Sequence, residues 1–332
     1  MHTFQGSDAV LTARTVQRQL AALLPECRPA GAGDSTLEIA GQGMDAPRLI
    51  SATMLEGGAL CGRLVSGEPT PGFRAFLDGT QRSEVVSYVA AVPLVLGHAA
   101  AVIRERRGGR MFTWSTPLSA TRVYGPRAML SSADWSTLAA AYGDALVDTS
   151  DGDADVTSHP LALRDAAIHR VQGHREALEW RLAEAWCQQE DEPLFIDGGI
   201  SGSEAVAVSP ATIGVVKSHR TLYAEGDALV AVLSLGHRER SSVFRVTSPR
   251  RTAVASWYLR LRDPDGHDPM WGLIRVESAH PSADVVGRIG DRADEVSRWI
   301  LAEVSPLALP DARWDKMVYG IRDCEEFLRA TR

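Results

Sequence analysis

Two apolar segments of this chain end in the same way, with an aspartate followed by a glycine. Residues 72–80 read Gly-Phe-Arg-Ala-Phe-Leu-Asp-Gly-Thr, and residues 194–199 read Leu-Phe-Ile-Asp-Gly-Gly. A short apolar run bounded by turn residues is typical of a buried β-strand. An aspartate at the end of such a strand places a carboxylate at the rim of a sheet, and the following glycine lets a ligand approach the backbone closely. We therefore expect Asp78 and Asp197 at the rim of a sheet.

Asp-Gly is also a common turn dipeptide, and for either copy taken alone a turn is the better interpretation. The same dipeptide occurs at Asp151-Gly152 and Asp265-Gly266, but in polar loops, whereas the first two copies follow apolar runs. Carboxylate oxygens suit Mg²⁺ and Mn²⁺, and several that converge can hold metals for displacement at a phosphodiester. The pattern predicts a metal-dependent phosphodiesterase.

The rest of the chain mixes helical and strand-like periodicity. Helices are predicted at residues 9–26, at 161–189 as one helix or as two that break at Gly173, and at about 283–304 and 320–331. Further strands are predicted at 87–96, 99–103, 213–219, 228–233, 253–261 and 272–276. The glycine-rich segment 198–203 lacks the frame of a phosphate-binding loop and is expected to form a mobile loop over the site.

Four segments, in order along the chain, resemble motifs of the NurA nucleases. They are Phe76-Leu77-Asp78-Gly79-Thr80, Leu178-Glu179, Phe195-Ile196-Asp197-Gly198 and Ile213-Gly214-Val215-Val216-Lys217. The resemblance implies an α/β fold with an RNase H-like mixed central sheet flanked by helices, carrying helical and β elaborations. It also implies one nuclease domain over residues 1–332, with an N-terminal helix and lead-in region at 1–70, an RNase H-like core at 71–278 and a C-terminal helical region at 279–332.

The same resemblance implies that Asp78, Asp197 and Glu179 bind Mn²⁺ or Mg²⁺. Glu176 lies one helical turn before Glu179 and is the second candidate for the helical ligand. Lys217, at the end of an apolar run, is expected to contact a phosphate oxygen or to orient the attacking water, although a solvent-facing lysine is an equal alternative.

Two further parts of the site stay open at this stage. His219 would share a face with Lys217 if the strand continued, but an ordinary surface histidine is the better interpretation. The C-terminal segment of the family has no clean counterpart here, because Trp314 to Asp323 lacks its histidine. The last contributor is therefore Asp323, Glu277 or His280, or is absent.

Composition constrains the setting. The 332 residues are 45% hydrophobic and 23% charged, as in ordinary globular proteins, and the net charge of −7 does not favour nucleic-acid binding by the whole molecule. Basic residues gather locally at 104–110, 237–240 and 250–251. Four scattered cysteines and the absence of a long apolar segment predict a cytoplasmic protein without a membrane span.

The predicted function is that of a DNA nuclease, in DNA end processing and repair or in antiviral defence. By resemblance, its partners are DNA, a HerA-type hexameric ATPase and a second copy of the chain in a homodimer. One alternative is an RNase H-like DNA-binding subunit that has lost catalysis. Another is an interaction subunit that docks on an ATPase ring, in which case Asp78 and Asp197 would lie far apart.

Overall fold

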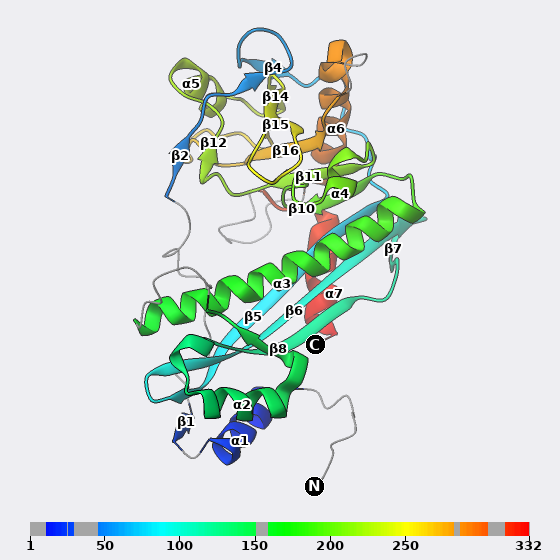
Figure 1. Ribbon diagram of the computed structural model, residues 1–332. Coiled ribbons are helices and arrows are strands. Elements are labelled where there is room, and N and C mark those ends of the chain that lie inside the picture. Colours follow the sequence, from blue (N-terminus) through cyan, green and yellow to red (C-terminus); the bar gives the residue numbers. More distant parts are fainter. Residues whose placement is uncertain are drawn as a thin grey trace. The chain divides into compact units, whose positions relative to one another are not determined.

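The computed structural model describes residues 11–24, 26–29, 46–150, 159–281, 286–304 and 316–331. They form an α/β protein in which a large mixed sheet is flanked by helices (Figure 1). The chain divides into two units. Unit 1 comprises Met1–Met44, Thr80–Ala100 and Leu118–Leu178, and unit 2 comprises Asp45–Gly79, Ala101–Pro117 and Glu179–Arg332. Strands β5 (Ala75–Val89) and β6 (Val92–Arg107) and helix α3 (Pro160–Gln189) contribute residues to both units.

Unit 2 is built around a mixed sheet in the order β3-β14-β15-β16-β11-β10-β5. These strands are β3 (Thr53–Met54), β14 (Phe244–Val246), β15 (Val254–Arg260), β16 (Leu273–Ala279), β11 (Thr212–Val216) and β10 (Leu194–Asp197). The strands β5, β10 and β11 are parallel to one another, whereas β16 is antiparallel to β11 and β15 is antiparallel to β16. The strand β15 is buried along its whole length, in keeping with its mostly apolar sequence.

Two helices of unit 2 pack on this sheet. The helix α6 (Ile289–Glu303) contacts β15, where Trp257 Nε1 donates to Ser297 Oγ at 3.0 Å. The helix α7 (Tyr319–Ala330) contacts β5, where Cys324 Sγ donates to the carbonyl of Phe76 at 3.3 Å. Shorter elements complete the unit: β2 (Arg48–Leu49), β4 (Gly62–Leu64), β7 (Arg110–Thr113), α4 (Glu204–Val208), β12 (Thr221–Leu222), α5 (Asp227–Leu233) and β13 (Glu239–Ser241).

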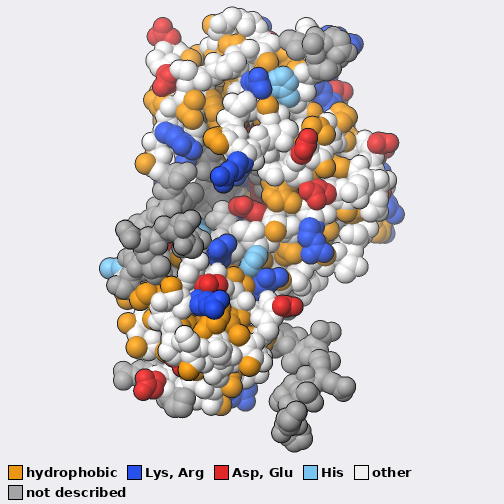
Figure 2. Space-filling model, in the orientation of Figure 1, with side chains coloured by type: hydrophobic (Ala, Val, Ile, Leu, Met, Phe, Trp, Pro, Cys, Tyr) orange, Lys and Arg blue, Asp and Glu red, His pale blue; other side chains and the backbone are white. Residues whose placement is uncertain are grey.

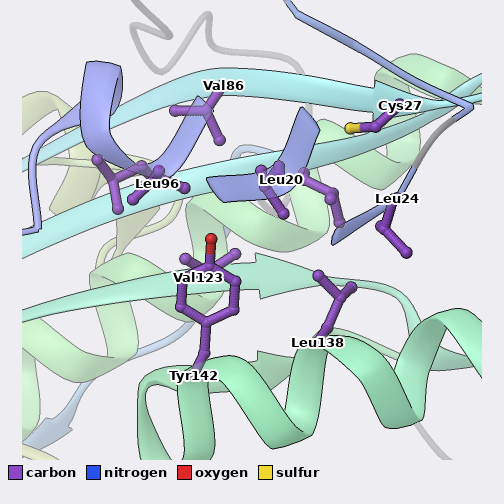
Figure 3. Close-up of a cluster of buried hydrophobic side chains, with 10 residues drawn as sticks. Leu20, Leu24, Cys27, Val86, Leu96, Val123, Leu138 and Tyr142 are labelled. Carbon is purple, nitrogen blue, oxygen red and sulfur yellow. The ribbon is translucent and has the colours of Figure 1, made fainter. Parts of the chain in front are cut away.

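Unit 1 has its own apolar core. Its remaining elements are α1 (Ala13–Leu23), β1 (Cys27–Pro29), β8 (Leu118–Gly125), α2 (Ser132–Tyr142) and β9 (Leu146–Asp148). The hydroxyls of Thr12 and Ser131 cap the N-termini of α1 and α2. Buried side chains of these helices, including Leu20 and Leu138, pack with those of β5, β6 and β8 (Figure 3). This cluster is the apolar core of unit 1, and it contains none of Asp78, Glu179, Asp197 and Lys217.

Three predictions about elements are wrong. The apolar run 87–96 is not one strand, because β5 ends at Val89 and the chain turns at Ala90, whose φ is 52°, before β6 begins. The segment 99–103 belongs to the same β6. Residues 228–233 form helix α5 instead of a strand. A short apolar run without alternation does not distinguish a strand from a helix. Helix α3 is one helix that continues through Gly173, which is one of the two arrangements that the sequence allowed.

Other predictions are confirmed. The N-terminal helix is α1, the strands at 253–261 and 272–276 are β15 and β16, and the C-terminal helices are α6 and α7. The Asp265-Gly266 pair lies in a turn, with Gly266 at φ 76°. The Asp151-Gly152 pair and the segment around Trp314 lie outside the described residues. Among the helices that the structure describes, none has the length and apolar character needed to cross a membrane.

Candidate metal centre

Asp78 and Asp197 lie at the same level on neighbouring parallel strands of unit 2. The last residue pair that joins β5 to β10 is Leu77 with Ile196, and each aspartate is the next residue on its own strand. Equivalent positions on adjacent parallel strands point to the same face, and such strands are about 4.8 Å apart. The two carboxylates therefore share one face of the sheet. Asp197 ends β10 as expected, whereas Asp78 lies inside the long strand β5 and not at its end.

The carboxylate of Asp78 is buried among other acids. Only 5% of the residue is exposed. Burial raises the pKa of Asp78 well above its ordinary value, and the negative charges of Asp197, Glu179 and Glu325 raise this pKa further, while Lys217 lowers it. Three other carboxylates of unit 2 thus act on Asp78, against one cation.

Lys217 supplies one cation to this group. Its Nζ donates to Asp197 Oδ2 at 2.8 Å, and both side chains are 21% exposed. The residue follows β11, two positions after Val215, which pairs with Asp197 across the parallel strands. Lys217 thus lies beside the acids as an ion pair with Asp197, and the contact with a phosphate or with the attacking water that the sequence predicts stays a prediction.

The two helical candidates, Glu176 and Glu179, lie one turn apart on α3. Glu179 belongs to unit 2 and is one of the acids that raise the pKa of Asp78. Glu176 belongs to unit 1, where Gln172 Nε2 donates to it at 2.9 Å. Of the two glutamates, Glu179 is therefore the one that acts on the carboxylate of Asp78.

The C-terminal helix brings an acid that sequence reasoning missed. Glu325 of α7 raises the pKa of Asp78, and its carboxylate, 13% exposed, also accepts a bond from Arg329 at 3.0 Å. The expected candidate Asp323 instead pairs with Arg104 Nε at 2.5 Å. The helical spacing could have indicated Glu325. This residue lies one helical turn after Ile321, which is fully buried, and so lies on the same face of α7.

Glu277, another expected candidate, fixes the loop that follows Asp197. Its buried carboxylate accepts the backbone N–H of Ile200 at 2.8 Å and pairs with Arg275 at 2.5 Å. A Cβ at Gly199 would lie 3.0 Å from this carboxylate, so the glycine permits the close approach. Ile200 is fully buried. The loop is thus anchored in unit 2, whereas the sequence predicts a mobile loop over the site.

The two histidine candidates have different surroundings. His219 does not share a strand face with Lys217, because β11 ends at Val216. Its Nε2 lies 2.7 Å from the carbonyl of Leu273, and its Nδ1 is buried without a partner among the described residues. Burial first, and then the neighbouring cations with Lys316 the strongest, lower the pKa of His219 to about 4, so the ring is neutral at pH 7. His280 lies at the end of β16, with Nδ1 2.9 Å from the carbonyl of Pro281.

The basic clusters of the sequence are largely neutralised. Arg104, Arg106 and Arg107 pair with Asp323, Glu303 and Glu105, respectively. Arg240 is buried between Glu56 and Asp294. On the face shown in Figure 2, Lys and Arg side chains are interspersed with acidic and apolar ones. The arginines of these clusters that form ion pairs thus have their charge offset within the protein, whereas Arg110, Arg250 and Arg251 are exposed.

The donor chemistry of the acids fits a hard divalent cation. Within the described parts of the chain, no group of three or more His, Cys, Asp or Glu side chains is arranged to hold a metal ion. The acids that act on Asp78 nevertheless supply only oxygen donors, which Mg²⁺ and Mn²⁺ prefer. A divalent cation would also offset the repulsion that raises the pKa of Asp78.

Comparison with known proteins gives no family. No protein-family model matches the chain, and no curated protein matches its sequence. The arguments for function therefore rest on the residues and on their arrangement.

Proposed function

We propose that this protein is a metal-dependent DNA nuclease of RNase H-like fold that hydrolyses phosphodiester bonds at the acids of unit 2. The observation that carries the proposal is the adjacency of Asp78 and Asp197 on parallel strands, with Glu179 and Glu325 also acting on Asp78. An acidic cluster at neighbouring strands is suited to phosphoryl chemistry with Mg²⁺ or Mn²⁺. The mixed sheet, in which β10 and β11 are parallel to a strand of the β5-β6 hairpin, is compatible with an RNase H-like core.

Asp78, Asp197 and Glu179 would hold the metal, and Glu325 would add negative charge beside them. A bound Mn²⁺ or Mg²⁺ would activate water and neutralise charge that develops on the phosphate. Lys217 would exchange its bond with Asp197 for one with a phosphate oxygen of the substrate, which stabilises negative charge there. Glu277 would keep the backbone after Asp197 in place through its bond with Ile200.

The first prediction concerns the two strand aspartates. Purified protein with Mn²⁺ should degrade linear DNA, and Asp78→Asn or Asp197→Asn should lower the rate by about 100-fold or more, as expected for loss of groups that hold a catalytic metal. The matched control is Asp265→Asn, which changes the same Asp-Gly dipeptide in an exposed turn. Cleavage of a labelled DNA fragment measures each rate.

Equal cleavage by wild type and by the Asp78→Asn protein would show that the acids of unit 2 are not the catalytic centre. A rate lost equally in the Asp265→Asn protein would indicate an effect unrelated to the proposed metal ligands. Lys217→Ala should retain the metal but lower the rate, because its proposed contact is with the phosphate.

A second candidate function is a DNA-binding subunit without catalysis. It is favoured by the ion pair of Lys217 with Asp197, since a lysine already neutralises one of the acids. This candidate predicts DNA binding without cleavage in both Mg²⁺ and Mn²⁺, and binding that is unchanged in Asp197→Asn. A cleavage assay and a binding assay on the same preparation separate the two functions.

The proposed partners are DNA, a HerA-type hexameric ATPase and a second copy of this chain, in DNA end processing or antiviral defence. These partners follow from the resemblance of the Asp78, Glu179, Asp197 and Lys217 motifs to NurA nucleases. Measuring the mass of the protein in solution, alone and with a HerA-type ATPase, tests the dimer and the complex.

A further inference from the structure

Unit 2 contains a cavity that the proposed nuclease centre does not use. Its volume is about 790 Å³, within the range typical of sites for small organic molecules. Three parts of the unit enclose it: the segment after α4, the end of β16 and the first turns of α6. Val208, Pro210 and Ile289 give it an apolar wall. Asp78, Glu179, Asp197 and Lys217 do not line the cavity.

Two residues at the end of β16, Ser278 and His280, line this cavity, and each has a buried polar atom without a hydrogen bond to the described residues. Ser278 is 4% exposed, and its Oγ has no partner among the described residues. The Nε2 of His280 is also buried and unpaired within that part of the chain. Because His280 Nδ1 donates to the carbonyl of Pro281, Nε2 of the neutral ring is an acceptor. An unpaired buried polar group is unfavourable, and a ligand that bonds to it removes this cost.

The charged side chains around the cavity leave one arginine available. Arg292 is bound to Glu295 at 2.6 Å and to the carbonyl of Pro210 at 2.8 Å. Arg298 donates to the carbonyl of Ser66 at 2.7 Å. Arg288 is exposed and has no ion pair or hydrogen bond with the described residues. Three arginines and two acids, Asp291 and Glu295, line the cavity, so its formal charge is 3 − 2 = +1.

The position of Arg288 adds a second attraction for an anion. Arg288 is the N-cap residue of α6, a helix of 15 residues, and its side chain makes no capping bond. The first backbone N–H groups of a helix and its dipole favour negative charge at this end. The residue with the free guanidinium and the first residue of α6 thus both line the cavity, which Ser278 lines as well.

We propose that this cavity binds a phosphate monoester with a largely planar or apolar organic body, of the size of a nucleoside monophosphate. The phosphate would bind Arg288 and the N-terminus of α6. The organic body would lie on Val208, Pro210 and Ile289, with its polar edge bonded to Ser278 Oγ and His280 Nε2. The site is independent of nuclease activity and would exist in a protein that cuts no DNA.

Calorimetric titration of the full chain in EDTA tests the proposal, with AMP, adenosine and inorganic phosphate as probes. AMP should bind, inorganic phosphate should compete with it, and adenosine should bind at least about 10-fold more weakly, because it lacks the charge-assisted bonds. Arg288→Gln should weaken AMP binding by about 10-fold or more, and Ser278→Ala should weaken it by several-fold. The control is Arg245→Gln, an exposed arginine on β14.

No binding of AMP to the wild-type protein overturns the proposal. So does adenosine binding as tightly as AMP, or AMP binding that Arg288→Gln leaves unchanged. Arg288 is exposed, so its substitution tests the site even if Ser278→Ala unfolds the chain, and the melting temperature of each variant identifies that case. Asp78→Asn should leave AMP binding unchanged, which distinguishes this cavity from the proposed metal centre.

Discussion

Asp78 illustrates how a single buried acid can lower the stability of a fold at neutral pH. In the fold it is buried beside three other acids, and its pKa is raised. A group whose pKa is higher in the folded chain contributes stability below its unfolded pKa of about 3.9 and loses that contribution as pH rises through the folded pKa. At neutral pH without metal, this carboxylate therefore destabilises unit 2, and a bound cation would reverse the effect.

The second prediction follows from the raised pKa of Asp78, which makes its charged form destabilising at neutral pH. In EDTA at pH 7.5, Asp78→Asn should melt at a higher temperature than wild type, because the amide carries no charge to repel Asp197. Each kcal/mol gained raises the melting temperature by roughly 2–4 °C in a domain of this size. Mn²⁺ should stabilise the wild-type protein and have little effect on Asp78→Asn. A melting temperature that falls on substitution, with no response of wild type to Mn²⁺, would contradict the electrostatic account.

The third prediction concerns His219. Its pKa is about 4 in the fold and about 6.5 in an unfolded chain, so stability is complete above pH 6.5 and falls as pH drops towards 4. The full difference corresponds to about 3 kcal/mol. His219→Gln should therefore lose less stability than wild type between pH 7 and pH 4.5 in urea unfolding. His237→Gln, at an exposed histidine, is the control. Parallel pH profiles of wild type and His219→Gln would contradict this prediction.

At the scale of elements, the sequence predicts those helices and strands that have a local pattern of apolar residues. The helix α1 and the strands β15 and β16 follow from apolar spacing. The turn between β5 and β6 does not, because Ala90 and Ala91 carry none of the usual turn residues and buried strands continue on both sides. The apolar run of helix α5 predicts a strand because it is short.

For the candidate site, too, the sequence predicts the local motifs but not the contacts between distant segments. The aspartate motifs are visible in the sequence, but their adjacency depends on the register of β5 with β10, which no local pattern specifies. The effect of Glu325 on the pKa of Asp78 depends on the packing of α7 against β5. These two elements lie far apart in the sequence, so no local pattern predicts their contact. The relation of Asp323 to Arg104 is also set by that packing.

The fourth prediction tests this packing of α7. A Cβ at Gly320 would lie 2.1 Å from the Phe76 ring, so Gly320→Ala should destabilise the protein by about 1–3 kcal/mol and, by moving Glu325, lower any nuclease activity. Gly173→Ala is the matched control, because nothing lies within 4 Å of its added Cβ in the middle of α3. It should stabilise the protein by about 0.5–1 kcal/mol. Urea unfolding measures both changes, and equal effects of the two alanines would refute the packing argument.

At the scale of the whole molecule, all four proposed site residues belong to one unit. Asp78, Glu179, Asp197 and Lys217 lie in unit 2, whereas the core around Leu20 and Leu138 lies in unit 1. The fifth prediction is that Mn²⁺ slows amide hydrogen exchange in the peptides 193–200 and 319–330 but leaves 13–23 and 132–142 unchanged. Protection confined to unit 1 would place the metal elsewhere.

The interleaving of the two units has a consequence for synthesis on the ribosome. The chain passes from one unit to the other after residues 44, 79, 100, 117 and 178. Unit 1 has all of its segments once Leu178 has been translated, so it can finish folding while most of the other unit is still unmade. Unit 2 must keep the already translated strand with Asp78 available until Asp197, Lys217 and finally α7 emerge. A nascent chain that lacks α7 therefore has no complete acidic centre, and any cutting activity begins only after α7 has emerged.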